Sequence, residues 1–170
     1  RGYCSHVAEI INVTCNESTY LMDLEDLENK LSSGKVAAVF LENPSYLGFI
    51  ETGYAEIARL THKYKAFFVV QCDVASLGVM ESPTNYGADI VCGDIQPLGM
   101  HMQFGGGCGG FIATRHEEKI IDQFPTYMDG ITTTKNENEF GYGRAINYRC
   151  SHGSRETRGS ILERKQVYGA

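Results

Sequence analysis

Short apolar segments alternate with segments of helical periodicity over the first 124 residues. The apolar runs are four to eight residues long and almost free of polar interruptions, which is typical of strands in a parallel sheet. The segment at 9–14 is the weakest of them because it is short and mixed in character. These runs predict strands at residues 9–14, 36–43, 66–73, 88–94 and 109–115.

Three amphipathic segments lie between or after the predicted strands. Residues 23–31 place three leucines on one helical face and begin at Asp23, a predicted N-cap. Residues 53–65 and 116–124 have the periodicity of surface helices. Strands that alternate with helices are joined by right-handed crossovers into a mostly parallel sheet. We therefore predict an α/β fold of three layers, α/β/α, with a mostly parallel sheet.

The periodic pattern ends near residue 124. The region that follows is polar, is rich in Gly, Asn, Thr and Arg, and has no clear period. Such a stretch predicts a long functional loop or a segment that needs a partner to order it. The sequence therefore divides into a domain at residues 1–124 and an irregular region at residues 125–170.

Charge and apolar run length restrict the class of partner. The 170 residues carry 15 basic and 21 acidic side chains, a net charge of −6, which argues against general binding to nucleic acid or to anionic membranes. Apolar runs such as 36–41 are far too short to span a bilayer. The opening residues lack the apolar core of a secretory signal, so we expect a cytoplasmic location.

The six cysteines do not form a metal or redox motif. Their spacing is irregular and no C-x-x-C occurs, while Cys72 and Cys92 fall inside predicted strands as small apolar side chains. We expect reduced thiols. The pairs Cys4/His6 and Cys150/His152 have a C-x-H spacing that could bind a metal, but ordinary loop residues explain them better, and we predict no metal site.

Polar side chains follow three of the predicted strands. Asn43, Asp73, Asp94 and Gln96 stand at or just after carboxyl ends, which meet at the edge where α/β sheets bind ligands. An aspartate such as Asp73 can pair with the protonated ring nitrogen of a pyridine cofactor, and Ala75 is small enough to lie against the ring. Asp73 is equally explained as the cap of the following turn, so both interpretations stay open.

The loop "CGDIQPLGMHMQFGGGCGG", residues 92–110, has the layout of a cofactor loop without an amine. Its centre is Gln96-Pro97-Leu98-Gly99. The glycine run at 104–110 permits a tight turn or a close approach to a ligand, but it matches neither a dinucleotide fingerprint nor a P-loop. His101 has no evident nucleophile beside it, so the sequence does not predict a hydrolase triad.

Three blocks together carry a family resemblance: "FLENPSYLGFIE", the stretch from Val69 to Arg115 that contains "GADIVCGDIQPLG", and "SHGSRE". Over residues 23–156 the chain resembles subunit 1 of the glycine decarboxylase P-proteins (glycine dehydrogenase, aminomethyl-transferring) of the glycine cleavage system. The resemblance implies a fragment of the large domain of fold type I pyridoxal-phosphate (PLP) transferases. It also implies that residues 125–170 include the start of a C-terminal region.

The resemblance accounts for the missing amine. In two-subunit P-proteins the PLP lysine belongs to subunit 2, and Leu98 falls at the matching place here. Asn43, Asp73 and Ala75 match positions that hold PLP in catalytic relatives and would line a vestigial pocket in this chain. The resemblance therefore implies no catalytic residue and no covalently bound PLP on this chain, and the isolated chain is expected to be inactive.

The resemblance also implies partners. The chain would pair with P-protein subunit 2 in a heterotetramer that decarboxylates glycine and passes the aminomethyl group to the lipoyl arm of the H-protein. Two alternatives remain open. One is an independent PLP protein that uses Asp73 with another lysine, and the other is a non-catalytic interaction or regulatory domain with a vestigial PLP pocket.

Overall fold

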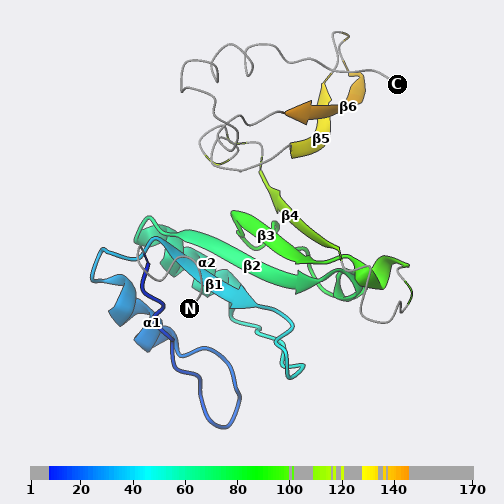
Figure 1. Cartoon of the computed structure of the whole chain (residues 1–170). Coiled ribbons are helices and arrows are strands. Elements are labelled where there is room, and N and C mark those ends of the chain that lie inside the picture. Colours follow the sequence, from blue (N-terminus) through cyan, green and yellow to red (C-terminus); the bar gives the residue numbers. More distant parts are fainter. Residues whose placement is uncertain are drawn as a thin grey trace. The chain divides into compact units, whose positions relative to one another are not determined.

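The computed structural model forms two compact units, Arg1–Ala113 and Thr114–Ala170 (Figure 1). Among the elements that the structure describes, α1, α2 and most of the larger sheet belong to the first unit, and a pair of short strands belongs to the second. The boundary predicted after residue 124 stays a prediction. The structure describes residues 8–99, 101, 109–115, 117, 120, 128–133, 136 and 138–145.

Four strands form the larger sheet in the order β1-β2-β3-β4. They are β1 (Ala38–Glu42), β2 (Phe67–Asp73), β3 (Ile90–Asp94) and β4 (Gly110–Thr114). The pairs β1–β2 and β2–β3 are parallel, so the carboxyl ends of these three strands lie at one edge of the sheet. The predicted α/β class with a mostly parallel sheet is confirmed.

Two α-helices connect to this sheet. The first, α1 (Leu24–Leu31), begins where the sequence predicts, because the Asp23 carboxylate accepts hydrogen bonds from the backbone N–H groups of Glu25 and Asp26. The second, α2 (Tyr54–Lys63), is the crossover between β1 and β2. Two short 3₁₀ helices, η1 (Val74–Gly78) and η2 (Gln96–Leu98), follow the carboxyl ends of β2 and β3.

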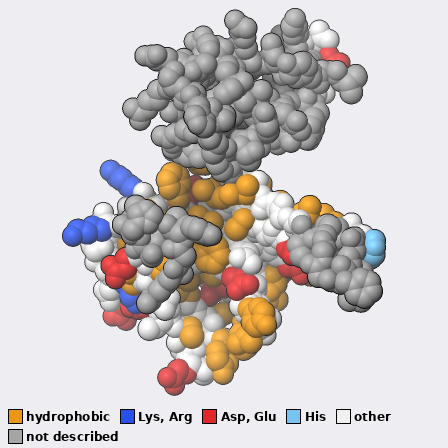
Figure 2. All heavy atoms as spheres, viewed as in Figure 1, with side chains coloured by type: hydrophobic (Ala, Val, Ile, Leu, Met, Phe, Trp, Pro, Cys, Tyr) orange, Lys and Arg blue, Asp and Glu red, His pale blue; other side chains and the backbone are white. Residues whose placement is uncertain are grey.

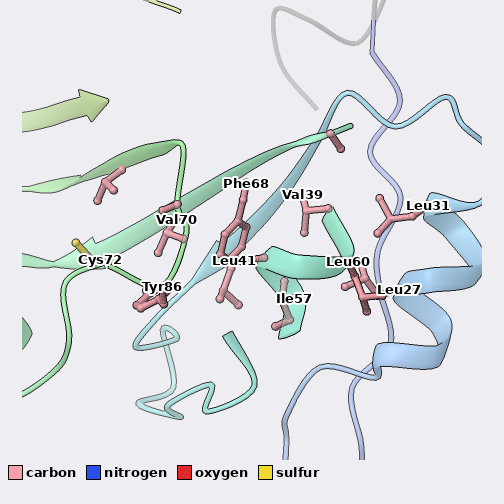
Figure 3. Close-up of a cluster of buried hydrophobic side chains, with 14 residues drawn as sticks. Leu27, Leu31, Val39, Leu41, Ile57, Leu60, Phe68, Val70, Cys72 and Tyr86 are labelled. Carbon is pink, nitrogen blue, oxygen red and sulfur yellow. The ribbon is translucent and has the colours of Figure 1, made fainter. Parts of the chain in front are cut away.

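The hydrophobic core lies between these helices and one face of the sheet (Figure 3). Phe68 and Val70 of β2 are completely buried at its centre, and Ile57 of α2 packs in the same cluster. Leu27 and Leu31 bring the apolar face of α1 to this cluster. Both helices therefore cover the same side of the sheet.

The opposite face of the sheet remains open in the described part of the chain. Phe40, Phe67 and Ile112 are 41–57% exposed, and Figure 2 shows hydrophobic side chains gathered over the strands. A parallel sheet is ordinarily covered on both faces. Of the three predicted layers, the described residues thus provide the sheet and one helical layer.

The structure differs from the sequence prediction in two segments. Residues 9–14 do not form a strand, and the nearest pairing is an isolated antiparallel bridge between Cys15 and Met22. Within the region predicted to be irregular, β5 (Met128–Thr133) and β6 (Phe140–Ala145) pair antiparallel. Most of the predicted helix at 116–124 lies outside the described residues. No helix in the described part is long and apolar enough to cross a membrane.

Candidate functional site

A hollow of about 610 Å³ opens at the carboxyl edge of the sheet. It lies where ligands bind in open α/β sheets, and the ends of all three parallel strands contribute to it. Asp73, Asp94 and Gln96, which the sequence places at strand ends, are brought together here. The lining residues are Glu42, Pro44, Ser45, Gly48, Gln71, Cys72, Asp73, Asp94, Gln96 and Pro97.

Asp73 and Asp94 are paired in the register of β2 and β3, and each is the last residue of its strand. Each carboxylate accepts a hydrogen bond from the backbone N–H two residues later. The Asp73 Oδ1 accepts a hydrogen bond of 2.9 Å from the Ala75 N–H at the start of η1. The Asp94 Oδ1 accepts one of 2.7 Å from the Gln96 N–H at the start of η2. Asp73 therefore caps η1, as the sequence predicted, and it is also one of the residues that line the hollow.

Ala75 lies two residues after Asp73, in η1, and is exposed. Its backbone N–H is already bound by the Asp73 carboxylate. The predicted contact between Ala75 and a cofactor ring stays a prediction.

Asn43 lies between Glu42 and Pro44, which line the hollow, and is not itself among the lining residues. Its side chain is 1% exposed, and both ends of the amide bind the backbone of Glu51. The Nδ2 donates to the Glu51 carbonyl at 3.2 Å, and the Oδ1 accepts from the Glu51 N–H at 3.0 Å. Asn43 thereby closes the connection between β1 and α2 that carries Ser45 and Gly48.

Glu51 is a site residue that the sequence prediction missed. The side chain is buried, and its two oxygens accept hydrogen bonds of 2.7 Å from the Gly53 and Met22 N–H groups. It therefore ties the start of α2 to the segment before α1. An acidic residue that directly follows the apolar "GFI" and precedes a helix was the available signal.

The hollow is acidic. Glu42, Asp73 and Asp94 are among the described residues that line it, and none of these described lining residues is Lys, Arg or His. Residues 66–114 contain no Lys or Arg at all. A phosphate group, by contrast, is ordinarily bound by cations or by free N–H groups at a helix start.

PLP is the cofactor that the family resemblance implies. The described residues of the hollow suit the ring nitrogen of PLP but not its phosphate or its aldehyde. Asp73 suits a protonated ring nitrogen, because the opposite charge keeps the ring cationic. The lining residues that the structure describes offer no cation for the phosphate and no amine for the aldehyde. Leu98, at the end of η2, is 71% exposed and cannot form an imine. The chain's described residues therefore do not form a complete PLP site.

Gly93 allows the strands beside the hollow to pack closely. A Cβ at this position would lie 2.2 Å from the Cys72 carbonyl oxygen and 2.7 Å from the Phe111 ring. Both Cys72 and Cys92 are free thiols, and burial raises the pKa of each. Cys72 packs in the hydrophobic core cluster, whereas Cys92 is half-buried in β3.

Other predicted features lie partly beyond the described chain. Residues 104–108 of the glycine run, together with the pairs Cys4/His6 and Cys150/His152, lie outside the described residues. His101 is exposed. Within the residues that the structure describes, no three His, Cys, Asp or Glu side chains come together as a metal site.

The sequence matches the family model "Glycine cleavage system P-protein" over residues 5–170. It is 39% identical over 127 residues to a protein of Staphylothermus marinus named "Probable glycine dehydrogenase (decarboxylating) subunit 1", a match that covers 75% of this chain and 27% of that protein. A protein of the same name from Carboxydothermus hydrogenoformans is 37% identical over 162 residues, which cover 95% of this chain and 35% of the relative.

The fold is also similar to that of a solved P-protein structure. The crystal structure of glycine decarboxylase (P-protein) of the glycine cleavage system, in inhibitor-bound form, superposes with a TM-score of 0.56 and 32% sequence identity. That match covers 76% of this chain and 31% of the solved one. The chain thus spans about a third or less of the length of the proteins that it matches.

Proposed function

Because the chain belongs to the glycine cleavage system P-protein family, we propose that it is part of subunit 1 of a two-subunit glycine decarboxylase. The substrate is glycine, and the aminomethyl group that remains after decarboxylation passes to the lipoyl arm of an H-protein. The parent protein assembles with P-protein subunit 2 as a heterotetramer in the cytoplasm. In this arrangement the present chain contributes a large-domain fragment and no reacting group.

The observation that carries this proposal is the composition of the hollow. Its described lining residues include those at strand ends of a cofactor-binding edge, and none of the described lining residues is lysine, arginine or histidine. Leu98 stands in the loop where a PLP enzyme needs its amine. PLP, when bound, supplies the electron sink that decarboxylation of glycine requires. We therefore assign the cofactor to a lysine of the partner subunit.

Side chains of this chain fix the backbone at the carboxyl edge of the sheet. Asp73 and Asp94 keep their carboxylates fixed at the start of η1 and η2. Asn43 and Glu51 hold the loop that forms the other side of the hollow. We propose that Asn43, Asp73 and Ala75 are vestigial cofactor-site residues, of which Asp73 lines the hollow, and that their present role is to preserve this surface within the assembly.

The proposal is tested by reconstituting the full-length parent protein with a lysine-bearing P-protein subunit 2 and an H-protein. We expect glycine-dependent release of carbon dioxide from the mixture and at most a background rate from the parent alone. Borohydride reduction in the presence of PLP, followed by peptide mapping, is expected to modify the partner's lysine and no residue of this chain.

Two variants serve as matched controls. Leu98→Met keeps an apolar side chain of similar size and should leave the activity of the mixture within about twofold. Replacement of the partner's PLP lysine by alanine should abolish activity. A modified lysine in this chain would favour the independent PLP protein, and stable association without decarboxylation would favour the interaction or regulatory domain.

A further inference from the structure

The connection between β1 and α2 contains a small closed turn at residues 45–49. The Ser45 N–H donates to the Phe49 carbonyl at 2.8 Å, and the Gly48 N–H donates to the Ser45 carbonyl at 2.8 Å. The Phe49 N–H also donates to the Ser45 Oγ at 3.1 Å. Gly48 adopts a φ of 85°, which an L-residue rarely takes, so the glycine suits this turn. The backbone of the turn is therefore fixed by its own bonds.

The tip of this turn presents two large apolar side chains to solvent. Tyr46 is 90% exposed and Leu47 is 76% exposed. Behind them Phe49 stacks on Tyr20, with ring centroids 4.4 Å apart and planes 16° from parallel. The buried amide of Asn43 anchors the base of the turn. Tyr46 and Leu47 are thus held outward by a supported turn.

The tip stands at the rim of the acidic hollow. Ser45 and Gly48, which flank Tyr46 and Leu47, both line the hollow, as does Glu42 at the end of β1. In Figure 1 this connection, drawn in cyan, projects beyond the carboxyl end of β1. The described lining residues beside this apolar projection include carboxylates and no cation, a charge that matches a surface of opposite sign.

We propose that the Tyr46–Leu47 tip is a docking anchor that enters an apolar socket flanked by basic side chains on the lysine-bearing partner subunit. The proposal rests on the proposed function for the identity of the partner. The chemistry of the socket follows from the tip and the carboxylates beside it. A preformed turn loses little conformational freedom on binding, and a central aromatic anchor is typical of interface hot spots.

The test measures the affinity of the full-length parent protein for the purified lysine-bearing subunit, by biolayer interferometry at several salt concentrations. We expect Tyr46→Ser and Leu47→Ser each to weaken binding about tenfold or more. The control is Ile10→Ser, which removes another strongly exposed apolar side chain far from this turn in sequence and should change affinity less than about threefold. Glu42→Gln should slow association at low salt and have little effect at high salt.

The possible outcomes separate the two proposals. If the unmodified parent does not bind the partner at all, the proposed function fails. If the parent binds and the tip variants bind equally well, the docking anchor is overturned while the subunit role stands. If the tip variants instead lower the melting temperature of the unpaired parent and leave the affinity unchanged, another segment of the same polypeptide covers the tip, and the anchor is again overturned.

Discussion

Asn43 illustrates how one residue can satisfy a cofactor-site pattern while doing structural work. Its place after β1 predicted a ligand contact, but the structure buries it and commits its amide to Glu51. The position in sequence was sufficient to place Asn43 near the edge. It could not reveal the direction of the side chain, because that depends on the backbone of Glu51 eight residues later.

Replacement of Asn43 by alanine should therefore destabilise the fold itself. The change removes two hydrogen bonds and leaves a buried N–H and a buried C=O of Glu51 without their partners. We expect a loss of about 2 kcal/mol or more in the free energy of unfolding, measured by urea denaturation without PLP. Asn85→Ala, at an exposed position, should cost less than about 0.5 kcal/mol. Equal stability of the two variants would contradict the structural role.

The helices and strands that the sequence predicted best are those marked by their own residues, through a cap, a helical period or an apolar run. The N-cap at Asp23 and the leucine periodicity define α1 locally, and the apolar runs define β1, β2 and β3. Residues 9–14 failed as a strand because a strand exists only with a neighbour that pairs with it. The pair β5 and β6 was missed because its glycines and threonines give no apolar alternation.

Helix α1 is fastened to the preceding segment by one carboxylate. Asp26 accepts hydrogen bonds from Lys30, four residues on, and from both the N–H and the Oγ1 of Thr14. Lys30 is the main cause, with Thr14 next, of a pKa for Asp26 that is lowered to about 2. A carboxyl group whose folded pKa is depressed contributes stability above its unfolded pKa and loses it as the pH falls.

We therefore expect the free energy of unfolding to fall between about pH 4 and pH 2 in part through Asp26. The variant Asp26→Asn should show a shallower fall over this range, as measured by urea denaturation at half-unit steps of pH. Glu25→Gln, in the same helical turn, is the control and should keep the slope of the unmodified protein. An unchanged slope in Asp26→Asn would disprove the assignment.

The whole molecule combines a well-formed core on one side of the sheet with an apolar surface on the other. The class of fold followed from the alternation of strands and helices. The open face could not be foreseen, because the apolar strands predict cover on both sides, whereas the described chain supplies helices for one. The chain spans about a third or less of the length of its relatives. The hydrophobic pattern of this chain therefore could not show how much of the sheet is covered.

The open face should make the 170-residue chain associate with itself in isolation. Contiguous apolar surface on a soluble domain drives association, and β1 adds an unpaired edge. Sedimentation velocity is expected to show mass that rises with concentration. Phe40→Lys, on both the edge and the open face, should reduce this association, whereas Lys35→Arg should not. A monomer at all concentrations would contradict the prediction.

The carboxylate–backbone hydrogen bonds of Asp73 and Asp94 have a consequence for how such proteins are classified. Each aspartate holds the first turn after its own strand, so losing it harms folding whether or not a cofactor is ever bound. Under the proposed function, a residue typical of PLP sites persists in a chain that contributes no reacting amine. A genome search that scores these aspartates would then group catalytic and non-catalytic proteins together, and the residue at the position of Leu98 would separate them.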